Sequence, residues 1–446
     1  METSARFYLE RMRLQVERAR RRQFPAASDV PAKWLAYIDG RLKSIEVELE
    51  TSNSAADSYT LSQRLLTNLF ACYEELDHLS RADTSQVADY VVLALLRWFN
   101  KTNDGCDYLF TADKEFELDP LLVKADMEVE FHHAHHERAV NELKPIVYRV
   151  TMPGGALGSA FHIPLVGHEV GHVLIERFFS ELEPLLEKLS GAVPAKSKEA
   201  YQRWMQEIIA DTICGFVSGP AAFFALHEKL RGKLEPNNDY PDNAMRTRSL
   251  WDFTSAKFGD ALAARSIRGG QLDSWSVPDD KELGERAASH KNYEQLSRKL
   301  ISDAGKVRAA AVNLAIKHIP DLEYRSEDLS SDLDMHLKSF LWVIPPFETN
   351  GDLPKRSATS LATILNVGWY IAAFQLEELK IKIPEGMDRR GKQLIELDKL
   401  MLKSIELSEI RRLWEEEDGE RTGQRKAAGA SHGKGAGKKA RGRTAT

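Results

Sequence analysis

The 446-residue sequence contains only three cysteines, and this scarcity excludes several kinds of protein. Cys72, Cys106 and Cys214 are odd in number and far apart, so they indicate reduced thiols rather than a disulfide framework. No Cys-x-x-Cys pair is present, and a metal would therefore depend on histidine and carboxylate ligands. This cysteine usage is typical of a cytoplasmic protein, which is the location we predict.

Long apolar runs are missing as well. The longest candidate, residues 361–374, is shorter than the ~20 residues of a membrane-spanning helix and contains Asn366, so we expect a buried helix there and no membrane span. The first 22 residues are rich in charge and do not resemble a secretory signal. Neither a phosphate-binding glycine motif nor the Gly-x-Ser-x-Gly motif of serine hydrolases occurs.

Acidic residues are absent from residues 421–446, which carry eight Lys or Arg. The whole chain has a net charge of −6, so the remaining residues have a net charge of −14. The segment is rich in Gly and Ala, and we predict that residues 419–446 form a disordered basic tail. A solubilising role is the favoured interpretation, and binding of nucleic acid or of an acidic partner is the alternative.

Helical periodicity dominates the rest of the chain. We predict a helical N-terminal region over residues 1–104 and a helical C-terminal region over residues 261–418. The region between them, residues 105–260, contains two strand-like segments, Tyr108 to Leu118 and Ile146 to Met152, followed by further helices. These patterns predict an α+β protein that is predominantly helical.

The most informative motif is the pentapeptide His168-Glu-Val-Gly-His172, which lies in the apolar run from Ile163 to Ile175. Two histidines four residues apart project from one face of a helix and can bind one metal ion. Glu169 can then reach a water molecule on that metal, and Gly171 leaves room for a close neighbour. We therefore predict a buried helix with His168 and His172 as zinc ligands and Glu169 as the catalytic base.

Catalytic zinc needs a third protein ligand. The third histidine of metzincins is absent, because Ile175 and Phe178 stand where that pattern has Gly and His. A second predicted helix, from about Glu199 to Val217, holds Glu207 and Asp211 as the only acids of an apolar stretch, and both share one face. We predict that Glu207 is the third ligand and that Asp211 accepts the ring N–H of a ligand histidine.

Together, His168-Glu-x-x-His172 and Glu207-x-x-x-Asp211 resemble the gluzincin class of zinc metallopeptidases, and they are similar to soluble relatives of the CAAX prenyl proteases. The resemblance covers residues 145–217. It implies a zincin-like catalytic core with an active-site helix, a glutamate helix and an edge strand, Ile146 to Met152, whose free edge pairs with an extended peptide. It also implies one zinc ion and a peptide or protein substrate.

Members of this group carry a His-Pro segment and a downstream arginine, and here Tyr240-Pro241 and Arg246 occupy that place. The resemblance implies that Tyr240 or Arg246 donates a hydrogen bond to a developing oxyanion, while the alternative is that Pro241 only begins a helix. The implied reaction is hydrolysis of a peptide bond by a metal-bound water, whose proton Glu169 transfers to the leaving amine.

Other interpretations stay open. The two histidines of the pentapeptide could be packed core residues, or the zinc could serve hydrolysis of a non-peptide amide or ester. A non-catalytic interaction protein with a structural metal site is a third alternative, although the presence of Glu169 favours catalysis. The cluster of four histidines between His132 and His136 is interpreted as an exposed segment, with transition-metal binding as the alternative. The sequence makes no prediction of oligomeric state.

Overall fold

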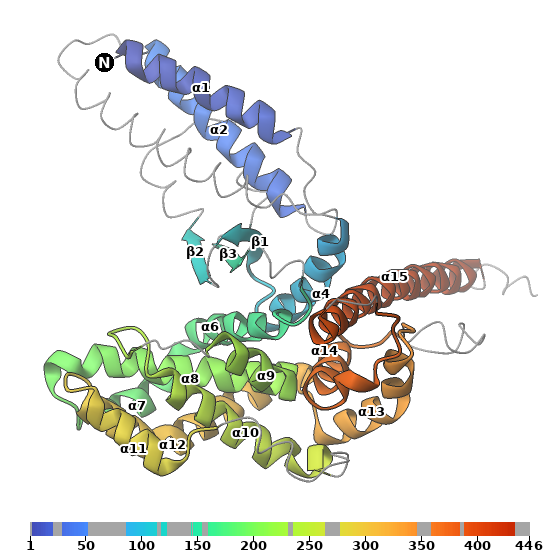
Figure 1. Ribbon diagram of the computed structural model, residues 1–446. Helices are drawn as coiled ribbons and strands as arrows, with labels where there is room; N and C mark the ends of the chain where they lie inside the picture. Colours follow the sequence, from blue (N-terminus) through green and yellow to red (C-terminus); the bar gives the residue numbers. More distant parts are fainter. Residues whose placement is uncertain are drawn as a thin grey trace, which may run out of the picture.

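Helices make up most of the structure, as predicted, together with one three-stranded sheet (Figure 1). This computed structural model describes residues 2–20, 29–51, 86–113, 117–122, 144, 146–153, 159–230, 235–263, 277–345, 358–383 and 388–432. The predicted helix from Thr60 to Leu79 and the histidine cluster at His132 to His136 lie outside these residues.

Helices precede and follow the strands along the chain. The helices are α1 (Glu2–Arg20), α2 (Val30–Thr51), α4 (Gln86–Thr102), α6 (Val166–Arg177), α7 (Phe179–Ser190), α8 (Lys198–Ser218), α9 (Pro220–Lys229), α10 (Asn243–Ala263), α11 (Asp280–Ser289), α12 (Glu294–His318), α13 (Ser326–Leu341), α14 (Leu361–Tyr370) and α15 (Arg389–His432). The strands are β1 (Asp107–Asp113), β2 (Glu117–Leu122) and β3 (Ile146–Pro153). Short helical turns are η1 (Ile163–Leu165), η2 (Ala195–Ser197), η4 (Pro320–Leu322), η6 (Ile371–Gln375) and η7 (Leu376–Glu378).

The sheet has the strand order β1-β3-β2. Tyr148 of β3 lies opposite Tyr108 of the parallel strand β1 and opposite Pro120 of the antiparallel strand β2. Two predictions are therefore wrong: the single strand from Tyr108 to Leu118 is two strands, and the segment from Ile146 to Met152 is the central strand, not an edge strand. The physical reason lies in the residues, because β3 is apolar and buried, whereas Pro120 lacks the N–H that a central strand needs.

Helix α8 is the centre of the helical body, and α6, α10 and α12 pack around it. Its side chains are buried nearly continuously from Tyr201 to Ser218, which fits a helix that is apolar on most faces. One hydrophobic core extends from Val91 to Ile405 and crosses both predicted region boundaries. The predicted helix from Glu199 to Val217 is thus confirmed as the element on which the rest of the body is assembled.

The predicted break after α8 depends on Gly219, which has a φ of 64°. A side chain at this position would collide with Tyr324 and Asn366. The Asn366 side chain of α14 donates to the carbonyl of Ser218 and accepts from the N–H of Ala221, both at 2.8 Å. These bonds satisfy backbone groups between α8 and α9 and attach the C-terminal helices to the centre of the body.

One pair of helices and one single helix extend from this body (Figure 1). At one end, α1 packs along α2 as an antiparallel pair that projects past the sheet. At the other end, α15 projects outward and continues to His432, beyond the predicted end of the folded part at residue 418. Residues 361–370 are buried, as predicted, and none of the described helices has the length and apolar character needed to cross a membrane.

Candidate metal centre

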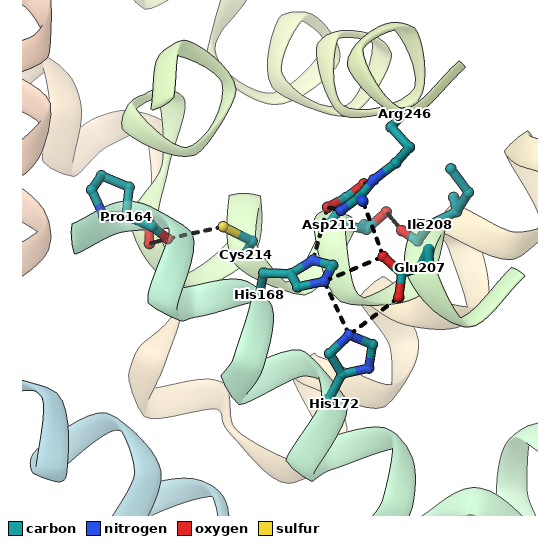
Figure 2. Close-up of polar contacts among 10 residues, drawn as sticks. Pro164, His168, His172, Glu207, Ile208, Asp211, Cys214 and Arg246 are labelled. Carbon is teal, nitrogen blue, oxygen red and sulfur yellow. Dashed lines mark hydrogen bonds and ion pairs between the residues drawn. The ribbon is translucent and has the colours of Figure 1, made fainter. Parts of the chain in front are cut away.

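Helices α6 and α8 bring His168, His172 and Glu207 together (Figure 2). The Nε2 atoms of the two histidines face each other at 3.0 Å. Nε2 of His168 lies 3.4 Å from Oε2 of Glu207, and Nε2 of His172 lies 3.4 Å from Oε1. All three side chains offer a ligand atom within 4.8 Å of the others, so the residues predicted as ligands form a group that could hold a metal ion.

The close approach of α6 and α8 depends on small residues. A Cβ atom at Gly171 would lie 2.7 Å from Cα of Ala210, too close for any real side chain. One turn earlier, a Cβ atom at Gly167 would lie 3.3 Å from Cα of Cys214. Cys214 itself is buried, and its Sγ donates to the carbonyl of Pro164 at 3.0 Å, so it packs between the helices as a small side chain rather than as a ligand.

Asp211 supports the first histidine from one turn further along α8. Its Oδ1 lies 2.8 Å from Nδ1 of His168, although the angles of this contact are not those of a hydrogen bond. This leaves Nε2 of His168 directed toward His172 and Glu207. The short distance fits the role that the sequence assigned to Asp211, and that role stays a prediction.

Arg246 of α10 lies behind both carboxylates (Figure 2). Its Nε and Nη2 donate to the two oxygens of Asp211 at 2.8 and 2.7 Å, and its Nη1 lies 3.1 Å from Oε2 of Glu207. With its guanidinium buried and directed at these carboxylates, Arg246 is placed to position Glu207 and Asp211. This arrangement differs from the oxyanion contact that the resemblance implied, and the sequence alone did not indicate it.

Tyr240 lies at the rim of the group. Its ring centroid is 6.0 Å from Cζ of Arg246, and its side chain is exposed to solvent. The loop that carries it is held by Asn237, whose Oδ1 accepts from the N–H of Tyr240 and whose carbonyl accepts from the indole of Trp204, each at 2.8 Å. Tyr240 is therefore a fixed, exposed phenol next to the arginine, and its predicted role in catalysis stays a prediction.

The charges of the group act strongly on one another. Burial alone would lower the pKa of His168, but Glu207 and Asp211 outweigh it and raise that pKa to about 9. Burial disfavours ionised carboxylates, yet Arg246 and His168 hold the pKa of Asp211 at about 2 and that of Glu207 well below its usual range. A proton on His168 offsets the surplus negative charge of the two carboxylates, and a bound cation would take the place of that proton.

Two further observations indicate that the group fits a metal ion. Oε2 of Glu207 is buried and receives no hydrogen bond, since its contact with Arg246 lacks hydrogen-bond geometry. The side chain of His172 is 28% exposed, while that of Asp211 is 2% exposed, so the group opens to solvent beside His172. Glu169, the predicted base, is buried on the same helix, directly after His168.

Comparisons with protein-family models, with curated proteins and with solved structures find no match to this chain. The likeness to gluzincins is thus carried by the motif residues, and the arrangement of His168, His172 and Glu207 stands on its own geometry.

Proposed function

We propose that this chain is a zinc-dependent metallopeptidase of the gluzincin type, with one zinc ion held by His168, His172 and Glu207. The spacing of the ligand atoms carries the proposal. Zinc–ligand bonds of roughly 2.0–2.2 Å in tetrahedral geometry place ligand atoms about 3.3 Å apart. The separations in this group are 3.0 Å between the ring nitrogens and 3.4 Å from each ring nitrogen to a Glu207 oxygen.

The composition of the group favours a catalytic site over a structural one. Structural zinc sites are usually closed by four protein ligands, many of them cysteines, whereas catalytic sites have three ligands and one open position. The group has three such side chains among the described residues and opens to solvent beside His172. Nitrogen and carboxylate ligands together also fit zinc better than magnesium or calcium, which prefer oxygen.

In this proposal, each polar residue around the group has a role in the reaction. When bound, zinc lowers the pKa of a water molecule and polarises the scissile carbonyl. Glu169 accepts the proton of the attacking water and delivers it to the leaving amine. Asp211 orients His168, and Arg246 keeps Glu207 and Asp211 ionised and in place. Tyr240, exposed at the rim, donates a hydrogen bond to the bound substrate in this proposal.

An extended peptide is the substrate that we propose. Strand β2 is one of the two outer strands of the described sheet and contacts α6, the helix of both histidines. A peptide pairing with β2 would therefore lie beside the metal centre, in the place that the sequence assigned to residues 146–152. Cytoplasmic location belongs to the same proposal and follows from the cysteine usage alone.

The test is metal content and hydrolysis in the wild type and in Glu169→Gln. We expect about one zinc per chain in both proteins and a loss of roughly 100- to 10,000-fold in peptide hydrolysis in the variant, because only proton transfer is removed. Glu176→Gln, an exposed change on the same helix, is the matched control and should keep full activity.

Three results would redirect the proposal. A wild-type protein that cannot be loaded with zinc would refute the ligand assignment. Cleavage of amides or esters without cleavage of any peptide library would favour a non-peptide hydrolase. Stoichiometric zinc without any hydrolysis would favour the non-catalytic interaction protein.

A further inference from the structure

A cavity of about 830 Å³ lies where α4, α13, the start of α14 and α15 meet. Its volume falls in the roughly 300–1,000 Å³ range of small-molecule sites. It shares no residue with the metal centre, although Val217, six residues after Asp211 on α8, forms part of its wall. Most of its charged lining residues fall into two groups, one basic and one acidic.

The basic wall consists of Arg97, Lys101 and Arg412. Nε of Arg97 and Nη1 of Arg412 contact opposite oxygens of buried Glu409 at 3.0 and 2.7 Å. Nη2 of Arg412 also donates to the carbonyl of Thr359 at 2.9 Å. Nη1 of Arg97 also contacts Glu416 at 2.8 Å, so ion pairs with α15 hold both guanidinium groups in place at the cavity.

The acidic wall consists of Asp321, Asp328 and Asp332. Asp332 is only 8% exposed, and its Oδ2 accepts from the hydroxyl of Tyr324 at 2.8 Å. Among the described residues, no Lys, Arg or His forms an ion pair with Asp332. A buried carboxylate without a cationic partner is costly, and at a cavity wall it indicates that the missing cation belongs to a ligand.

The first turn of α14 joins the two walls. Thr359 contacts Arg412 at the basic side, and Thr363, four residues later, hydrogen-bonds to Asp332 at the acidic side. The cap residue Ser360 and the first three helical residues all line the cavity. The positive end of the helix dipole therefore lies between the two walls and also faces Asp332 through Thr363.

We propose that this cavity binds a short peptide with free termini, with its ammonium group at Asp332 and its carboxylate between Arg97, Arg412 and the first turn of α14. Two opposite charges on one small ligand match the two oppositely charged walls of the cavity. The three aspartates would repel a nucleotide or other polyanion. A purely apolar ligand would remove water from both charged walls and offer no polar contact in its place. The proposal does not depend on the metallopeptidase function.

The experiment is calorimetric titration of the full-length chain with trialanine at pH 7, where most of the amine is protonated. The protein carries Glu169→Gln, so that the peptide stays intact if the chain is a peptidase. We expect trialanine to bind at least about 10-fold more tightly than N-acetyl-trialanine and than trialanine amide, because each analogue loses one charge-assisted contact.

The substitution Asp332→Asn tests whether the ammonium group of the peptide lies at Asp332. It should weaken trialanine binding about 10-fold and leave the binding of N-acetyl-trialanine nearly unchanged, because only the free amine interacts with the lost charge. Asp334→Asn, an exposed change on the same helix outside the cavity, is the matched control and should change neither value. Thermal melting confirms that both variants fold, and if Asp332→Asn does not fold, the three peptides on the parent protein still decide the question.

Three outcomes would overturn the proposal: no binding of trialanine at millimolar concentration, equal binding of the free and capped peptides, or trialanine binding that is insensitive to Asp332→Asn in a folded variant. Binding that is lost in His168→Ala but kept in Asp332→Asn would place the peptide at the metal centre and would also contradict it. Zinc content and hydrolysis are measured separately, so failure of the cavity proposal is distinguishable from failure of the proposed peptidase.

Discussion

Buried carboxylates occur both at the metal centre and at the contact between α4 and α15, but their surroundings differ. Glu409 of α15 is held between two arginines, Arg97 and Arg412. At the metal centre, Glu207 and Asp211 share one arginine, Arg246. Arg97 also pairs with Glu416 at 2.8 Å, so the first group has two negative and two positive charges. The second has two negative charges and only one arginine.

The comparison distinguishes a structural ion pair, at Glu409, from a candidate metal-binding group, at Glu207 and Asp211. A buried ionised carboxylate is tolerated when nearby cations compensate it, and Glu409 meets that condition with side chains alone. Glu207 and Asp211 do not, and the groups that face their surplus charge are His168 and His172. Histidine is the side chain that can either take up a proton or bind a metal, so a proton on His168 or a cation can balance the surplus charge.

The largest expected effect is the loss of measurable zinc binding in Glu207→Gln. A neutral amide removes both a ligand and the charge that attracts the ion, so the loss should exceed the roughly 10- to 100-fold expected for a residue that only supports a ligand. Glu409→Gln is the matched control and should keep zinc stoichiometry unchanged. Competition titration with a chromogenic chelator measures both, and equal zinc affinity in the two variants would contradict the comparison.

Arg246→Met should have the next largest effect. It leaves Glu207 and Asp211 buried without a cation, which should lower the free energy of unfolding of the metal-free protein by about 3–5 kcal/mol. Added zinc should restore part of that loss, because the ion supplies the missing positive charge. Urea unfolding with and without zinc tests this, and Arg412→Met should cost less, since Glu409 keeps Arg97.

The smallest effect is expected for Asp211→Asn. This change keeps the shape of the side chain but removes the charge next to Nδ1 of His168, so zinc affinity should fall about 10- to 100-fold without loss of stoichiometry. Asp242→Asn is the control, because Asp242 is equally buried but its carboxylate is held by Arg286 and His290 and is not part of the metal-binding group. A zinc affinity in Asp211→Asn equal to that of the wild type would contradict the role of Asp211.

The metal group could be predicted from sequence because helical periodicity is local. A spacing of four placed His168 with His172 and Glu207 with Asp211, and the apolar surroundings of both pairs indicated two buried helices. The close approach at Gly171 followed from the same pattern, and the structure confirms it with Ala210 as the neighbour.

Features that depend on which elements become neighbours could not be predicted in this way. The position of Arg246 behind Glu207 depends on how α10 packs on α8, and the central place of residues 146–152 depends on strand order. The cavity between α4 and α15 joins residues more than 300 positions apart, such as Arg97 and Arg412. Sequence spacing carries no signal for contacts of this kind.

The contact between Gly171 and Ala210 has a mechanical consequence. Because no side chain separates α6 from α8 at this point, the distance between the two backbones directly sets the distance from His172 to Glu207. Any partner that moved these helices apart by about an ångström would lengthen the distances between the three metal-binding side chains. The affinity for the ion would then fall. The fraction of protein with bound metal would then depend on the distance between α6 and α8. A bound ion would in turn hold these two central helices together.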